Sequence, residues 1–237
     1  MGPTSALTGG RPEPSPEWSA EWFAEGFLER LRTRPLNFDA VEEQMTGDRG
    51  WHHYYSEAVI AVEPEGDDYF KRACVALSNY QFSDPGIVIA HFDPDTELLG
   101  RRILLEIQIF GLRYLCPALV QRVRDEPNVY GFRYDTLEGH IEKGLEWFLL
   151  TKNERGEIRF RIEARWQKGQ FPNWWSRIGF MVLSGYYQRK WHRRAHHRLS
   201  MLAHYGSTRR PPKDAAGLTH QGIDVTFTYH TKRKWIP

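Results

Sequence analysis

The sequence predicts an α+β protein in which a curved antiparallel sheet grips a long C-terminal helix. Residues 129–166 contain three strand-like runs joined by turns, and the first and third alternate large apolar with polar or small residues. A period of two puts one set of side chains on a buried face and the other in water. Residues 174–204 then carry a helical pattern long enough, at about 1.5 Å per residue, to cross a whole sheet. Such a helix-grip arrangement encloses a hydrophobic cavity between sheet and helix.

The composition suits one large domain, or one domain with appendages, of 237 residues. No apolar run approaches the ~20 residues that span a bilayer, and no signal-peptide pattern opens the chain. The two cysteines, Cys74 and Cys116, are too few for a disulfide framework, which indicates a reducing, cytoplasmic setting. Nine tryptophans favour an aromatic core or an aromatic-lined pocket.

The distribution of residue types along the chain predicts four segments. Residues 1–14 are rich in Gly, Pro, Ser and Thr and are expected to be disordered. Residues 15–35 begin with Ser-Pro-Glu and continue with apolar residues at helical spacing, which predicts an N-terminal helix appendage. That helix packs on the domain or binds a partner. The helix-grip domain is expected over 36–205, and 206–237 form a loop and a C-terminal strand extension.

Short elements separated by regular Gly and Pro residues argue against a parallel Rossmann-type sheet. The residues 153–156, Asn-Glu-Arg-Gly, are a hairpin turn signal. Asp67 and Asp68 are expected to cap a second helix. The predicted strands cover 51–62, 87–91, 102–110, 115–123, 129–136, the two arms of the hairpin around 153–156, and 223–229.

The long helix carries an apolar stripe at spacings of three and four residues, facing away from a basic side. The stripe comprises Phe180, Leu183, Tyr187, Trp191, Ala195, Leu199 and Leu202. The basic side comprises Arg189, Lys190, Arg193, Arg194, His197 and Arg198.

Residues 132–148 read F-R-Y-D-T-L-E-G-H-I-E-K-G-L-E-W-F. This segment resembles the signature F-x-Y-G-T-L-x-G-H-P-x-x-G-E-E-x-F of an uncharacterised bacterial and plant protein family of the START/birch-allergen-like helix-grip (SRPBCC) class. The similarity extends over roughly 38–205, including Gln188 in the basic helix. It implies the helix-grip fold and no established activity. Asp135, Ile141 and Leu145 depart from the signature, and the last change removes one of its two adjacent glutamates, which argues against chemistry by that pair.

The leading hypothesis is a domain that binds an apolar or amphipathic small molecule between the sheet and the long helix. Ligand pockets are mostly apolar and contain a few placed polar groups. No cofactor is expected, and the sequence does not specify an oligomeric state. The residues expected to contact the ligand are Arg133, Tyr134, Thr136, Phe180, Tyr187, Gln188 and Trp191.

An enzyme is the alternative, with Asp135, His140 and Glu146 as a catalytic acid/base cluster in the loop region between two strands. His140 equally suits a structural role in which it bonds the turn backbone or a carboxylate. His192 and His196 have the i, i+4 spacing of metal ligands, but neighbouring guanidinium groups repel a cation, so no metal site is predicted.

The charge distribution allows a third function. Residues 171–237 contain 12 basic and two acidic residues, a net charge of +10, so the remainder carries −8. The basic helix, with Lys232, Arg233 and Lys234 beyond it, is a candidate surface for nucleic acid or an anionic membrane. A solvated face, or docking against the acidic residues Glu42, Glu43 and 63–68, explains the same pattern.

Overall fold

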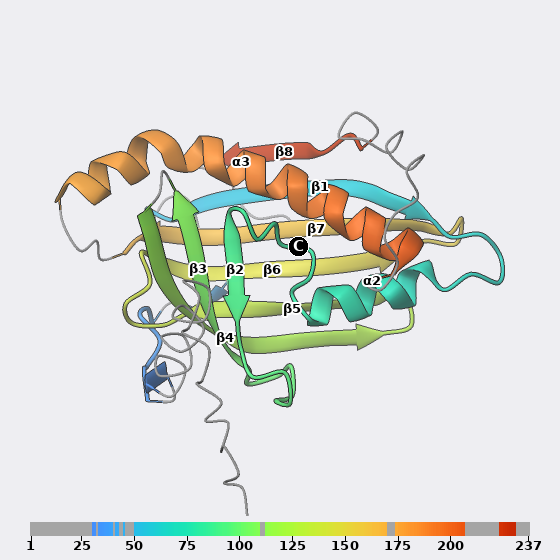
Figure 1. The fold of residues 1–237 in the computed structure, drawn as a ribbon, viewed down its shortest axis with the longest axis horizontal. Helices are drawn as coiled ribbons and strands as arrows, with labels where there is room; N and C mark the ends of the chain where they lie inside the picture. Colours follow the sequence, from blue (N-terminus) through green and yellow to red (C-terminus); the bar gives the residue numbers. More distant parts are fainter. Residues whose placement is uncertain are drawn as a thin grey trace, which may run out of the picture.

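The computed structural model describes residues 30–31, 33–39, 41–42, 45, 50–109, 112–169, 174–206 and 223–230. The expected tail 1–14 and all but the end of the expected helix 15–35 lie outside these residues. Within the described part, a curved antiparallel sheet carries helices α2 and α3 on one face (Figure 1). The predicted fold class is therefore confirmed.

The sheet has eight strands in the order β2-β3-β4-β5-β6-β7-β1-β8, and every described pairing is antiparallel. Its curvature carries β2 and β3 across the middle strands in Figure 1. The strands are β1 His52–Val62, β2 Val88–His91, β3 Arg102–Ile109, β4 Leu112–Glu126, β5 Val129–Thr136, β6 Glu142–Lys152, β7 Glu157–Lys168 and β8 Thr226–His230.

The predicted hairpin joins β6 to β7 through residues 153–156. Gly156 has a φ of +75°, and the Asn153 side-chain oxygen accepts the backbone N–H groups of Arg155 and Glu157. This is how Asn and Gly form tight turns. Register shifts at Val59/Ala61 and Val120/Arg122 interrupt two ladders, and such bulges bend strands.

Helix α2, Tyr69–Ser78, packs against α3 and buries Phe70, Ala73 and Leu77. Its predicted cap is only partly right. Asp68 occupies the N-cap position but its side chain makes no capping bond. The side chain of Glu63, which follows β1, accepts the backbone N–H of Phe70 at 2.8 Å instead. This N–H has no partner within the helix, so a residue outside the helix satisfies it.

Helix α3, Trp174–Tyr205, crosses the sheet and buries Trp191, Ala195 and Leu199 of the predicted stripe. The side chains of Phe180 and Leu183 lie outside the described residues. Near the helix C-terminus, the Arg72 guanidinium of α2 donates to the carbonyl of Ala203 at 2.7 Å, which satisfies a terminal carbonyl. Among the helices described, none is long and apolar enough to cross a membrane.

Aromatic rings fill the space between sheet and helices at one end. Tyr80 and Phe82, from the segment after α2, stack on Phe148 of β6, with ring centroids 5.8 and 5.0 Å away. Ser83 accepts the indole N–H of Trp191 at 3.0 Å and donates to the carbonyl of Val88 at 2.7 Å. These contacts hold the segment under α3, so it closes one side of the space that remains.

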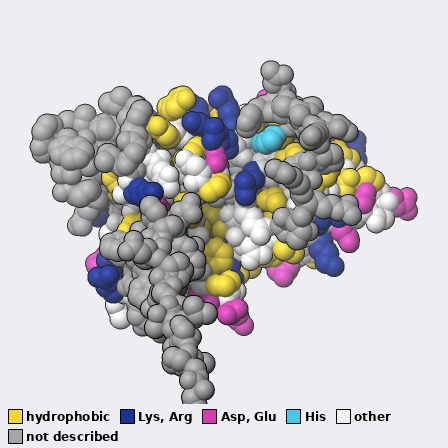
Figure 2. All heavy atoms as spheres, viewed as in Figure 1, with side chains coloured by type: hydrophobic (Ala, Val, Ile, Leu, Met, Phe, Trp, Pro, Cys, Tyr) yellow, Lys and Arg dark blue, Asp and Glu magenta, His cyan; other side chains and the backbone are white. Residues whose placement is uncertain are grey.

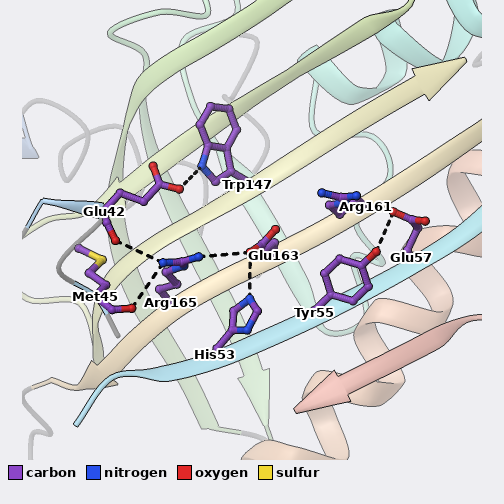
Figure 3. Close-up of polar contacts among 9 residues, drawn as sticks. All are labelled: Glu42, Met45, His53, Tyr55, Glu57, Trp147, Arg161, Glu163 and Arg165. Atoms are coloured by element: carbon purple, nitrogen blue, oxygen red, sulfur yellow. Dashed lines mark hydrogen bonds and ion pairs between the residues drawn. The ribbon is translucent and has the colours of Figure 1, made fainter. Parts of the chain in front are cut away.

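The outer face of the sheet carries a polar network that includes Glu42 and Met45 (Figure 3). Glu42 bridges two strands, because its carboxylate lies 2.8 Å from Arg133 Nη1 and 3.0 Å from Trp147 Nε1. Arg165 donates to the carbonyls of Glu42 and Met45. This network fixes the chain before β1 on the sheet.

Candidate functional site

A cavity of about 110 Å³ lies between the curved sheet and the middle of α3. At about 10–15 Å³ per water molecule, this space holds roughly seven to eleven waters, or a ligand of about ten non-hydrogen atoms. Hydrophobic side chains reach the surface in the middle of this face in Figure 2, below a row of Lys and Arg side chains. The aromatic residues that line the cavity are Tyr54, Tyr80, Tyr134, Trp166, Tyr187 and Trp191. The aliphatic residues that line it include Ile87, Val88, Leu105, Ile107 and Ile109.

Two carboxyl groups belong to the polar part of the lining, together with Thr136, His140, Gln188 and His192. Glu142 and Glu146 occupy positions of the same parity on β6 and both line the cavity. Tyr134, on the paired strand β5, donates its hydroxyl to Glu146 Oε2. Burial raises the pKa of Glu142 to about 8, with repulsion from Glu146 as a further cause. Burial also raises the pKa of Glu146 to about 7. These acids therefore change charge near neutral pH.

His140 lines the same cavity from the turn before β6, and its side chain is 3% exposed. Its Nδ1 accepts the backbone N–H of Glu142 at 2.9 Å. Burial lowers the pKa of His140 to about 4. The ring is therefore neutral at pH 7, and its proton is on Nε2. That buried nitrogen has no hydrogen-bond partner among the described residues.

Thr136 lines the cavity, but its hydroxyl is occupied by the protein. It accepts the N–H of Gly144 at 2.8 Å and lies 2.7 Å from Asn37 Oδ1, to which it donates. A ligand-binding role for this hydroxyl was expected, and the structure assigns it to the backbone of β6 instead. Thr136 thus holds Gly144, the residue midway between the two glutamates, against β5.

The structure brings most of the predicted ligand-binding residues to the cavity. Tyr134, Thr136, Tyr187, Gln188 and Trp191 all line it. Phe180 lies in α3, but its side chain is outside the described residues. Arg133 was expected here and faces the other way, because period-two alternation on β5 places it opposite Tyr134.

The predicted acid/base cluster does not assemble. Asp135 shares the outer face of β5 with Arg133, whose guanidinium lies 2.8 Å from Asp135 Oδ1, and it is absent from the cavity lining. The His140 side chain is hydrogen-bonded to the backbone of the turn, which is the structural role that the sequence analysis gave as the alternative to catalysis. Only Glu146 keeps both the position and the pKa of an acid/base group. Asp135, His140 and Glu146 therefore do not converge on one site, as the acid/base cluster had required.

His192 and His196 meet at a serine rather than a metal. Ser56 Oγ lies 2.6 Å from His192 Nδ1 and 3.0 Å from His196 Nε2, and all three side chains are buried. A hydroxyl has one proton, so it donates to one imidazole and accepts from the other. Burial lowers the pKa of His192 well below its ordinary value and that of His196 to about 3. No cluster of metal-ligating side chains is found among the described residues.

Three cavity residues had no signal in the sequence analysis. Glu142 lies four residues before Glu146 on β6, so the alternation of side chains places both on the same face, but this conclusion was not drawn from the sequence. Tyr54 is on β1, whose register only the pairing with β7 reveals. Tyr80 reaches the cavity through a backbone φ of +55°, which no local pattern predicts.

The basic side of α3 makes contacts within the molecule. Arg194 pairs with Asp84, and Arg198 Nε donates to the carbonyl of Gln81 at 2.5 Å. Docking against Glu42 was expected as one explanation, but Glu42 pairs with Arg133 on the outer face. A groove along α3 is lined by Arg189, Lys190, Arg193, Arg194 and His197, together with Ile223, Asp224 and Val225.

Comparisons with known proteins give a family match over most of the chain. The sequence model described as "Domain of unknown function (DUF1990)" matches residues 38–198. A UPF0548 protein of Deinococcus radiodurans is 33% identical over 108 residues, which cover 41% of this chain and 54% of that protein, so the chain spans about half the length of this curated relative. Structural similarities are distant. Human STARD10 is 9% identical with a TM-score of 0.42, covering 82% of this chain and 83% of that one. Ara h 8.0201 is 12% identical with a TM-score of 0.39, covering 65% and 98%.

Proposed function

Because the chain belongs to the DUF1990 family, whose function is unknown, we propose a function from the cavity: this domain binds an apolar or amphipathic small molecule between the sheet and α3. One observation carries the proposal. The space between sheet and helix contains a cavity of about 110 Å³, mostly apolar and with a few polar groups on one strand pair. Binding sites for small molecules have this composition.

A neutral fluorescent probe of matching size tests the proposal. 2-Naphthol has about ten non-hydrogen atoms, which the cavity accommodates. We expect saturable binding, seen as a change in its fluorescence and as a 1:1 complex in native mass spectrometry. Ala164, a cavity residue on β7, gives the diagnostic variant, because Ala164→Phe fills the space. Binding is expected to weaken at least tenfold.

The control variant adds the same aromatic ring outside the cavity. Val75 lies on α2 and is 53% exposed, so Val75→Phe should leave 2-naphthol binding unchanged. Equal binding by wild type and Ala164→Phe would show that the probe binds elsewhere and would contradict the proposal.

A second candidate function is proton transfer on the bound molecule by Glu146. Its carboxyl lies in a largely apolar cavity, is hydrogen-bonded to Tyr134, and has a pKa of about 7. A general acid or base works best when its pKa lies near the operating pH. In D₂O, small ketones that bind should then exchange the protons next to their carbonyl groups, as followed by NMR. No exchange above that of Glu146→Gln would rule this function out.

An anionic partner at the groove of Arg189, Lys190 and Arg193 remains a prediction. Contacts of this kind weaken steeply with salt, because bound counterions are released. Binding of oligonucleotides and anionic liposomes across a salt series tests it, with Arg189→Glu/Arg193→Glu as the variant. If neither ligand binds at low salt, the groove has no such partner.

A further inference from the structure

Carboxylates buried elsewhere in this protein have a cation beside them. Among the described residues, the four acids below 9% exposure are Glu42, Glu106, Asp135 and Glu163, and an arginine lies within 3.6 Å of each. This pairing is what the desolvation of charge requires, because an isolated buried ion is costly. The fold therefore supplies a positive partner wherever it encloses a carboxylate outside the cavity.

The two glutamates of the cavity, Glu142 and Glu146, are partly exposed rather than below 9% exposure, and their surroundings differ. Among the described residues that line it, none is a lysine or arginine, although Glu142 and Glu146 both belong to the lining. The groups that do approach them are neutral. Glu146 accepts a hydrogen bond from the Tyr134 hydroxyl, and His140 bonds the backbone of Glu142 with a ring that is uncharged at pH 7. Two partly buried acids thus share the cavity, and no Lys or Arg of its described lining lies beside them.

The remaining lining suits a cation from outside. Six aromatic side chains surround the space, those of Tyr54, Tyr80, Tyr134, Trp166, Tyr187 and Trp191. The faces of aromatic rings attract cations, and cages of such rings bind ammonium groups. Carboxylates and ring faces together therefore complement a positive charge on an apolar body.

An independent group points to a second feature of the ligand. His140 Nε2 carries a proton, is buried, and has no partner among the described residues. A buried donor without an acceptor costs roughly 1–3 kcal/mol. A ligand with a hydroxyl or carbonyl oxygen at this side of the cavity would satisfy it.

We propose that the ligand of this cavity is an amphipathic amine, with its ammonium group between Glu142 and Glu146, its apolar part on the aromatic rings, and a hydrogen-bond acceptor toward His140. This inference rests on the proposed binding function and names the class of ligand. It requires no residue outside the cavity and no metal or cofactor.

Three probes of nearly equal size separate the alternatives. 2-Phenylethylamine is a cation, 2-phenylethanol is neutral and phenylacetate is an anion, all with about ten non-hydrogen atoms. Each competes with 2-naphthol at pH 8. The amine should bind at least tenfold more tightly than the alcohol, and the anion most weakly. 2-Amino-1-phenylethanol should bind more tightly than 2-phenylethylamine to the wild type, and this gain should disappear in His140→Phe.

The isosteric double variant Glu142→Gln/Glu146→Gln tests the carboxylates themselves. It should bind 2-naphthol, which shows that the cavity is intact, but should bind amine and alcohol within about threefold of each other. Glu154→Gln, an exposed residue of the 153–156 turn, is the matched control and should keep the full preference.

Dependence on pH gives a further readout. Tyr54, Tyr80 and Tyr134 have pKa values raised by burial, whereas His140 and His192 have lowered ones. Between pH 6 and 8 these groups keep their charge while the two glutamates ionise. Amine affinity should therefore rise about tenfold over this range, with proton release on binding at pH 7, while 2-phenylethanol affinity stays constant.

Each result decides the question. If the alcohol or phenylacetate binds as tightly as the amine, or if the double variant keeps the preference, the amine assignment is overturned while the binding function stands. If 2-naphthol itself does not bind, the proposed binding function is contradicted, and the amine assignment that rests on it is contradicted with it. A tenfold preference for the amine that disappears in the double variant supports the assignment.

Discussion

The imidazole Nδ1 of His140 accepts the backbone N–H of Glu142 at 2.9 Å, which ties the turn before β6 to the strand that carries both cavity carboxyls. The contact fixes the tautomer with the proton on Nε2. It joins the His140 side chain to the first residue of β6 while the ring is uncharged at pH 7.

The first prediction is that His140 stays neutral in the folded protein. Its pKa of about 4 lies below the ordinary value of 6.5, because burial opposes the charged ring. ¹⁵N NMR of labelled protein should show an Nε2–H tautomer that does not titrate between pH 5 and 8. The signal is identified by its loss in His140→Gln. A midpoint near 6.5 would contradict this burial.

The second prediction concerns stability and pH. The folded-state pKa of Glu142, about 8, lies above its ordinary value of 4.5. The associated stability is therefore complete below pH 4.5 and is lost as the pH rises toward 8. Glu142→Gln, which cannot ionise, should be more stable than the wild type at pH 8 by on the order of 4 kcal/mol, and nearly equal to it at pH 4.5.

Urea unfolding at the two pH values measures this difference. Glu154→Gln provides the control, since its carboxyl lies in an exposed turn and its removal should change neither value. A Glu142→Gln protein no more stable than the wild type at pH 8 would mean that the carboxyl is well solvated.

The third prediction tests the serine between the two buried histidines. Ser56→Ala removes the only described partner of His192 Nδ1 and His196 Nε2. Unsatisfied buried polar groups cost about 1–3 kcal/mol each, so a loss of about 2–4 kcal/mol is expected in urea unfolding. Ser200→Ala is the control. It removes one hydroxyl from the Ile60 carbonyl and should cost about 1 kcal/mol. Equal losses would argue against a bridge.

The fourth prediction concerns the outer face of the sheet. Arg133→Met leaves the carboxylates of Glu42 and Asp135 buried without their shared guanidinium. Breaking such a buried group typically costs about 3–5 kcal/mol. Arg159→Met removes an exposed pair with Glu57 and should cost less than about 1 kcal/mol. The Arg133→Met defect should shrink as the pH falls and the carboxylates protonate. If the loss of stability does not depend on pH, it comes from lost packing rather than from unpaired charge.

Much of the fold was predictable because its strands alternate strictly. The inward set Phe132, Tyr134 and Thr136 follows from a period of two on β5, and the same rule excludes Arg133 and Asp135 from the cavity. Their assignment to one site with Tyr134 ignored this alternation. Local pattern was sufficient for strands β2 to β7, since they pair in the order in which they occur in the sequence.

The rest depends on contacts between distant residues. Ser56 meets His192 across 136 positions of sequence, and no local signal records that β1 lies under α3. Glu42 meets Arg133 across 91 positions of sequence. The role of His140 was ambiguous in the sequence, because a histidine in a turn can either bond the backbone or take part in catalysis. Only the position of the Glu142 N–H decides between these roles.

The last prediction concerns Gly144, which separates the two cavity glutamates on β6. Its φ is +150°, and an added Cβ would lie 1.9 Å from the carbonyl oxygen of Arg165 and 2.8 Å from the Cα of Trp166. Both atoms are backbone of β7, so they cannot turn aside as a side chain would. Gly144→Ala must therefore push β6 and β7 apart or break the bonds between Thr136 and Gly144.

We expect Gly144→Ala to destabilise the protein by more than about 3 kcal/mol, since it combines a backbone clash with a strained conformation. Gly66→Ala is the matched control. It also has a positive φ, of +86°, but open space around the added carbon, so it isolates the conformational cost of about 1–2 kcal/mol. Urea unfolding measures both. Folded Gly144→Ala protein at low temperature should also bind 2-naphthol less tightly, because the strand that carries Glu142 and Glu146 has moved. Equal destabilisation by the two substitutions would show that β6 and β7 separate easily at this point, and that the spacing of the two carboxyls is not held by their backbone contact.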